Sequence, residues 1–349
     1  MHGAGFLAGA VRFSPQVYNK SMTCMQSSSY AVVVGGANID IGARSLGPLV
    51  PKDSNPGIVT SVPGGVARNI AHNLALLGVP VVLLTALGDD SEGAFLQDAC
   101  IHSGIDMRHV LQSSNHRTSV YLYVADAAGE MQLAVSDMSI CEEITPAYLA
   151  AQQAILDNAA LVCADTNLTP AALKYLAEHC TQPLFVDPVS TNKAEKLHPL
   201  LSKIHTLKPN RLEAAALTGV EVTNAKSAAF AAQKLLAAGV RQVFLSLGED
   251  GLLAASQEGV EELASDSRHI VSTTGCGDAF MAALLYAHIH GYSLEDTARL
   301  ARAAARLVME SVHNIAPHLS EALLLQTAFP EKMPFSTQTA NHTEKGENP

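Results

Sequence analysis

The chain has 349 residues, of which 48% are apolar, 16% charged and 5% aromatic, with no Trp. This composition is typical of a globular protein with a sizeable core and excludes a largely disordered chain. The net charge of −11 argues against a nucleic-acid partner, because a polyphosphate backbone attracts basic surfaces. No apolar run reaches the roughly 18 residues that a membrane span needs.

The two ends of the chain differ in composition from its centre. Residues 1–29 contain no acidic residue and end in a run of serines, which favours either a disordered extension or a weak organelle-targeting segment. Residues 330–349 are polar, as in a disordered tail. The six cysteines form no C-x-x-C pair, which is typical of a reducing compartment. We therefore expect one folded domain over 30–329 in the cytoplasm, with an organelle (mitochondrial or peroxisomal) as the alternative location.

Short apolar runs alternate with longer Ala- and Leu-rich runs along this domain. The expected strands are 31–34, 81–86, 161–164, 184–186, 205–207 and 242–247. The expected helices are 66–77, 92–102, one starting after Thr145-Pro146, 170–180, 211–218, 227–238, 276–290, 294–312 and 318–328. Fully apolar strands separated by helices predict a mostly parallel sheet that is covered by helices on both faces.

Two segments interrupt this alternation. Residues 41–63 are rich in Gly, Pro and polar residues, and residues 108–136 alternate apolar with polar side chains. Such alternation is typical of strands with one solvent-exposed face, which do not belong in a buried parallel sheet. We expect both segments to form a small β lid, because lids exclude water from reactive groups.

One short motif combines glycines, a carboxylate and the start of an apolar helix: Gly275, Cys276, Gly277 and Asp278. The free amides of a first helical turn bind anions, and glycines let the anion approach. Asp278 would repel that anion unless it faces an incoming hydroxyl as a general base. The alternative is an ordinary first-turn acid. The chain has neither a P-loop motif nor a G-x-G-x-x-G fingerprint, which disfavours a nicotinamide-dependent oxidoreductase.

Other polar residues stand where parallel sheets bind ligands. Asn38 and Asp40 follow the first strand, and their spacing puts them on one side, which suits vicinal hydroxyls; the alternative is an Asx turn. Gly64 and Gly65 precede a helix that contains Asn69, which suits a sugar ring, although a tight turn and a buried Asn explain them equally.

Two further motifs are open to a structural explanation. Asn210 and Glu213 are spaced as in a capping box. Ser246, Gly248 and Gly251 lie at a strand end and in the tight turn that follows it.

Together these motifs resemble the ribokinase-like family of sugar and nucleoside kinases over about residues 31–326. The resemblance is carried by Gly64–Asn69, by Gly275–Asp278 and by the N-x-x-E motif between them. Within the family, four segments look most like pseudouridine kinases: 53–57, 68–78, 187–190 and 204–213. The resemblance implies a ribokinase-like three-layer α/β/α sandwich with a mostly parallel central sheet and an inserted β lid.

The resemblance also implies an activity, namely ATP-dependent phosphorylation of the 5′-hydroxyl of pseudouridine in nucleoside catabolism. Asp278 would be the general base, and the amides of Gly275, Cys276 and Gly277 would hold the transferring phosphoryl group. Residues implied for the substrate are Asn38, Asp40, Gly64, Gly65 and Asn69, with Asn55, Thr118, Ser119 and Tyr121 near its base. Residues implied for ATP are Asn210, Ser246, Gly248, Gly251 and Thr274. Glu213 would orient Mg²⁺ through water.

Several alternatives stay open. The substrate would otherwise be ribose, another pentose or another nucleoside, and a non-catalytic nucleoside-binding regulator would keep the fold without needing the base. Ser272 stands where potassium-activated relatives carry an acid, which leaves monovalent-cation dependence open. Cys276 replaces the Ala of many relatives, and its position at a helix start predicts an acidic, oxidisable thiol. Relatives of this kind often pair through their lids, which implies a possible homodimer.

Overall fold

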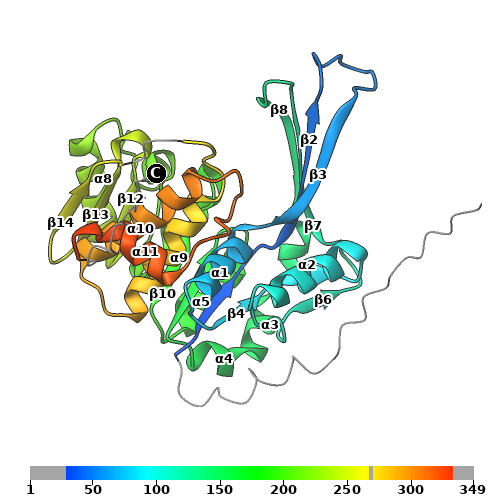
Figure 1. Cartoon of the computed structure of the whole chain (residues 1–349). Coiled ribbons are helices and arrows are strands. Elements are labelled where there is room, and N and C mark those ends of the chain that lie inside the picture. The colour runs from blue at the N-terminus through cyan, green and yellow to red at the C-terminus, as the bar shows by residue number, and fades with distance from the viewer. Residues whose placement is uncertain (1–28, 267–269, 333–349) are drawn as a thin grey trace, which may run out of the picture.

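The structure is a computed structural model that describes residues 29–266 and 270–332 (Figure 1). The extension expected up to residue 28 and the tail expected from 333 onward lie outside the described residues. Within the described ranges, no helix has the length and apolar character that crossing a membrane would require.

An eight-stranded sheet forms the centre of the body, in the order β14-β13-β12-β11-β10-β9-β1-β4. The strands are β1 Ala31–Val34, β4 Val81–Leu84, β9 Leu161–Asp165, β10 Leu184–Asp187, β11 Thr206–Leu207, β12 Gln242–Ser246, β13 Leu252–Ser256 and β14 Val260–Leu263. The pairs from β4 to β12 are parallel, which confirms the mostly parallel sheet. The antiparallel edge strands β13 and β14 are not predicted, because the polar residues around Gly259 hide a hairpin.

Helices cover both faces of this sheet, which confirms the three-layer architecture. Alternate residues of β1 point to opposite layers: Ala31 and Val33 join one core, Val32 and Val34 the other. The first core holds α1 Val66–Leu76, α2 Ser91–His102, α9 Cys276–Ile289, α10 Leu294–Met309 and α11 Glu321–Ala328. The second holds α3 Pro146–Ala151, α4 Gln153–Asp157, α5 Pro170–His179, α6 Thr191–Ala194, α7 Arg211–Thr218 and α8 Ala225–Ala237. Each fully buried Val, Leu, Ile, Phe or Met side chain contributes about 1.5–3 kcal/mol to folding.

A second sheet of four strands projects from the body as an arm (Figure 1). Its strands are β2 Asn38–Ser45, β3 Gly57–Gly64, β7 Ser119–Ala125 and β8 Met131–Asp137, in the order β3-β2-β7-β8. This arm is the expected lid. It begins at Asn38, so Asn38 and Asp40 belong to the lid and not to the end of the first body strand. Residues 111–113 instead form β6, which pairs with β5 Ala86–Gly88 beside the body.

Candidate active site

Asp278 lies in the first turn of α9, only 9% exposed. The side-chain amide of Asn69 donates a hydrogen bond of 2.7 Å to its Oδ2 atom, so the two motifs that frame the family resemblance meet directly. Burial, and after it the charge of Asp187, raise the pKa of Asp278 to about 7, against the opposing effects of Asn69, Lys208 and Arg68. A carboxylate with this pKa exchanges protons readily near neutral pH.

The turn that leads into α9 is built for close approach. Gly275 adopts φ 82°, and a Cβ atom there would lie 1.9 Å from the carbonyl oxygen of Asn314, so only glycine fits. The amides of the following first turn have no partner inside the helix, although that of Cys276 makes a long bond of 3.4 Å to the Thr273 carbonyl. These amides form the positive end of the helix, where an anion is stabilised.

A buried lysine lies beneath this turn. A Cβ atom on Gly277 would lie 3.2 Å from Nζ of Lys208, which itself forms an ion pair of 3.2 Å with Oδ2 of Asp187. Burial opposes the charged form, but Asp187 and Glu213 outweigh it and raise the pKa of Lys208. Lys208 therefore adds a fixed positive charge behind the amides. The motifs do not assign it a role; the available signal is its position, directly after a short buried strand.

The thiol of Cys276 is a correction to the sequence expectation. Instead of an acidic thiol, the structure has one whose pKa is raised to about 12 by burial and by the neighbouring charge of Asp278. The positive end of the helix does not compensate for the nearby carboxylate, so the thiol is protonated and unreactive at neutral pH.

The start of the lid meets the start of α1 at Asp40. The Asn38 amide donates to Oδ1 of Asp40 over 2.6 Å, and a Cβ on Gly64 would overlap this carboxylate at 2.4 Å. Gly65, at φ 97°, faces the backbone of Gly36 and Ala37. Packing against protein therefore accounts for both glycines, while their contact with a sugar stays a prediction.

Asp165, at the end of β9, organises this junction and is fully buried. Its carboxylate accepts hydrogen bonds from the amides of Gly36 (2.9 Å), Ala67 (3.0 Å) and Asn167 (2.8 Å). It thus ties the loop into the lid to the helix that carries Asn69. No motif points to Asp165; the one available signal is an acidic residue ending an apolar strand.

The four residues expected near a base are not brought together. Asn55 lies in the turn between β2 and β3, where its side chain bonds the backbone of Val50 and Asp53. The hydroxyl of Thr118 is engaged by Asp90 and by the amide of Gly88. Ser119 is buried opposite Asn38. Tyr121 is paired with Asp40 in the lid register and therefore shares its face of the sheet.

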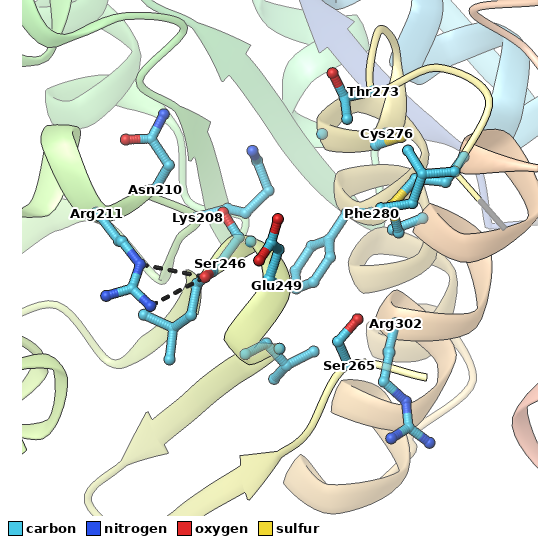
Figure 2. Close-up of a pocket in the computed structure, with 18 of the residues that line it drawn as sticks. Lys208, Asn210, Arg211, Ser246, Glu249, Ser265, Thr273, Cys276, Phe280 and Arg302 are labelled. Atoms are coloured by element: carbon cyan, nitrogen blue, oxygen red, sulfur yellow. Dashed lines mark hydrogen bonds between the residues drawn. The ribbon is translucent and has the colours of Figure 1, made fainter. Parts of the chain in front are cut away.

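A cavity of about 590 Å³ is lined on one side by the turn that contains Thr273, Cys276 and Gly277 (Figure 2). Six of the predicted residues line it: Asn210, Ser246, Gly248, Gly251, Cys276 and Gly277. Thr273 takes the place expected for Thr274. Figure 2 shows Asn210, Arg211 and Ser246 facing Thr273, Cys276 and Phe280 across this space. The guanidinium of Arg211 is fixed by the carbonyl of Leu247. The size suits a nucleotide.

Asn210 and Glu213 do form the capping box. The Asn210 side chain accepts from the amide of Glu213, and Oε2 of Glu213 accepts from the amide of Asn210, both at 2.9 Å. Glu213 itself is buried and does not line the cavity, whereas Asn210 does. Mg²⁺ commonly keeps several waters and takes only one or two carboxylates together with substrate phosphates. A water-mediated contact from Glu213 to a magnesium–nucleotide complex would need no direct ligand and stays a prediction; the described residues hold no cluster of three metal-ligating side chains.

Comparisons with known proteins agree with this geometry. Residues 28–321 match the model of the pfkB family of carbohydrate kinases. The chain is 36% identical to pseudouridine kinase of Escherichia coli K12 over 85% of this chain and 96% of that one. It is also 36% identical to the uncharacterized sugar kinase YeiI of the same bacterium, over 85% of this chain and 82% of that one.

A solved structure of Arabidopsis thaliana ribokinase, complexed with ribose and ATP, has the same fold. It superposes with a TM-score of 0.76 at 24% identity and covers 86% of this chain and 99% of its own. The family match covers most of both cores, the lid and the turn that carries Asp278. The chain therefore belongs to the pfkB family of carbohydrate kinases.

Proposed function

We propose that the chain transfers the γ-phosphoryl group of ATP to the 5′-hydroxyl of pseudouridine. The observation that carries this proposal is Asp278, a buried carboxylate with a pKa of about 7. It accepts a hydrogen bond from the Asn69 amide and directly follows Cys276 and Gly277, which line the nucleotide-sized cavity. Phosphoryl transfer needs positioning and charge stabilisation more than covalent help. Such a site supplies both.

In this proposal Asp278 accepts the proton of the 5′-hydroxyl as that oxygen attacks the phosphorus. Asn69 occupies Oδ2 of Asp278, which leaves Oδ1 free to face the hydroxyl. The Oδ1 atom of Asn69 is itself buried without a hydrogen-bond partner among the described residues. A buried acceptor without a partner costs about 1–3 kcal/mol. A ribose hydroxyl would satisfy it, which supports a sugar alcohol as the ligand of this site.

The developing charge of the phosphoryl group would be stabilised by the first-turn amides of α9, with Lys208 behind them. ATP would lie in the cavity lined by Ser246 and Gly248. Bound Mg²⁺, held by phosphate oxygens and by water next to Glu213, would neutralise charge on the phosphates. Asn38 and Asp40 would hold vicinal hydroxyls of the ribose, since their side chains already contact each other.

The choice of pseudouridine rests on similarity to the E. coli pseudouridine kinase. The equal identity to the sugar kinase YeiI favours a second candidate, a kinase for another nucleoside or for a pentose. Pseudouridine offers a ring N–H that uridine lacks. A buried acceptor for that group would discriminate strongly, because uridine would leave it without a partner.

A coupled assay of ADP release separates these candidates. Purified chain is supplied with ATP, Mg²⁺ and, in turn, pseudouridine, uridine, adenosine and ribose. We expect the highest kcat/KM with pseudouridine. Preference for ribose or another nucleoside would replace the substrate but keep the kinase. Binding of nucleoside without any turnover would instead identify the non-catalytic regulator.

We further propose that two copies of the chain pair through their lids. On the lid face opposite Asp40, cross-strand neighbours Val59, Ala43, Val124 and Leu133 form an apolar row. Val59 is 69% and Leu133 is 60% exposed. Exposed apolar rows of this kind mark interaction surfaces. A second lid would supply a matching apolar face by symmetry.

A further inference from the structure

A second cavity of about 400 Å³ lies on the outer side of α1 and shares no lining residue with the nucleotide-sized one. Its walls come from three parts of the body and from the base of the lid. α1 contributes Arg68 and His72, α2 contributes Ala99, the segment after α10 contributes Asn314, and β3 contributes Pro63. The proposed reaction uses none of these side chains.

Arg68 contributes a buried positive charge to the wall of this cavity. The side chain is only 4% exposed, and among the described residues its guanidinium bonds neutral partners alone. Nε donates to the carbonyl of Gly64 over 3.2 Å, one terminal nitrogen donates to the carbonyl of Pro63, and the other contacts Nδ1 of His72 at 3.2 Å. A guanidinium has five N–H donors, so two are left without a partner among the described residues, and the side chain lines the cavity. A buried charge without an ion-pair partner is costly, which favours an anion beside it.

His72 supplies a third donor. Burial, and then the charge of Arg68, lower the pKa of His72 to about 4, so the imidazole is neutral at physiological pH. Because Nδ1 accepts from Arg68, the proton resides on Nε2. No described residue accepts from this Nε2–H group. Because Arg68 and His72 both line the cavity, these N–H groups are the donors that a ligand there could use.

We propose that this cavity binds a small oxyanion, either inorganic phosphate or the phosphate group of a monoester, on Arg68 and His72. Arginine recognises phosphate through paired N–H donors. Asp278 and Asp40 favour the charged form of Arg68 from farther away, but neither forms an ion pair with it. Apolar walls at Leu76 and Ile315 suit the organic part of a monoester.

The cavity adjoins two elements that shape the reaction centre, the base of the lid and the turn before α9. Arg68 holds the last two carbonyls of β3 and thus the base of the lid. Asn314, across the cavity, packs its carbonyl against Gly275 at the start of α9. An oxyanion bound to Arg68 would therefore contact the residues that position both the base of the lid and the Gly275 turn. This inference does not depend on which alcohol the enzyme phosphorylates.

Isothermal titration calorimetry tests the proposal on the full chain. A non-hydrolysable ATP analogue is kept at saturation, so that the first-turn amides of α9 are already occupied, and inorganic phosphate or ribose 5-phosphate is titrated separately. We expect one oxyanion per chain. Tighter binding of ribose 5-phosphate that the cavity variant Ala99→Glu weakens would identify a monoester as the ligand, and equal binding would identify the free anion. No uptake of either compound would overturn the proposal.

Two substitutions test whether the oxyanion binds in this cavity. Arg68→Gln removes the charge and should weaken binding at least about tenfold, as expected for the loss of charge-assisted hydrogen bonds. Ala99→Glu leaves Arg68 and the lid base unchanged but places a carboxylate in the cavity wall, and it should weaken binding to a similar extent. Ala94→Glu, on the same helix but outside the cavity, is the matched control and should bind like the parent. Parental binding by Ala99→Glu would contradict the site, even if Arg68→Gln failed to fold.

Discussion

The residues around Asp278 and those on the lid face opposite Asp40 differ in their burial and in their contacts with other residues. Asn69, Asp187, Lys208 and Asp278 are at most 9% exposed and are linked by direct contacts or by close charges. On the lid, by contrast, Val59, Leu133 and Val135 are at least 58% exposed. The body end of the site is thus complete within one chain. The lid instead keeps exposed apolar surface, which the proposed pairing of two copies would bury.

The largest effect that this comparison predicts is at Asp278. Asp278→Asn keeps the shape and the Asn69 contact region but removes the proton acceptor. We expect kcat to fall by about 10²–10⁴, the usual contribution of a general base. Steady-state ADP release measures it. Asp98→Asn, an exposed residue of α2, is the control and should be neutral. Turnover of Asp278→Asn at the parental rate would remove Asp278 from the proposed role.

The buried ion pair should be the next most sensitive feature. Lys208→Met leaves the Asp187 carboxylate buried without its partner, so we expect the free energy of unfolding to fall by about 3–5 kcal/mol. Urea denaturation measures the loss. Lys174→Met removes an exposed lysine that pairs with Glu178, and it should change stability little. If Lys208→Met and Lys174→Met were equally stable, the buried ion pair of Lys208 with Asp187 would not contribute to the stability of the fold.

The acidic limb of the pH profile is a third test. Because Asp278 must be ionised to accept a proton and its pKa in the free chain is raised to about 7, kcat/KM should fall about tenfold for each pH unit below 7. The ordinary aspartate pKa would instead put this limb near pH 4. A kcat/KM that is constant between pH 5 and pH 7 would show that burial does not control the base.

The lid half of the comparison is tested by its apolar face. Leu133→Asp places a charge in the exposed apolar row, and we expect it to convert a dimer into a monomer in analytical ultracentrifugation. Ala134→Asp is the matched control, because successive residues of a strand point to opposite faces. A parent that is monomeric at micromolar concentration would refute pairing through the lid.

The smallest predicted effect concerns the pH dependence of stability. Burial lowers the pKa of His205 from 6.5 to about 4, with His288 and Arg241 adding to the shift. The unfolded chain therefore binds a proton at His205 that the folded chain does not, and stability should decrease as the pH falls from about 6.5 toward 4. His205→Gln should reduce this slope, whereas His102→Gln, at an exposed position, should not. An unchanged slope would contradict the assignment to His205.

Much of the body was accessible from the sequence. Apolar runs such as Ala31–Val34 have one local explanation, a buried strand, and helix ends at Thr145 and Gly219 carry clear capping residues. The meeting of Asn69 with Asp278 follows from two motifs at the ends of facing elements. Polar strands such as β14 are harder to recognise, because a partly exposed strand that contains two glutamates carries little apolar signal, even though its partner β13 directly precedes it in the chain.

The rest of the site could not be predicted for a physical reason. Asp165, Lys208 and Asp187 act through contacts made by the folded chain, and no spacing in the sequence encodes these contacts. The Cys276 thiol shows the same limit, since its helix-start position predicts a low pKa and its burial beside Asp278 raises it. Asn55 and Thr118 are polar residues in suggestive segments whose side chains are engaged by loop backbone and by Asp90.

The most direct test of the account is a crystal structure of the chain with pseudouridine and a non-hydrolysable ATP analogue. We expect the 5′-hydroxyl within about 3.2 Å of the Asp278 carboxylate, the reach of a general base, with the terminal phosphate against the Gly275–Gly277 turn. A nucleoside that binds with its 5′-hydroxyl beyond hydrogen-bond reach of Asp278, or a phosphate chain that avoids this turn, would contradict the central claim.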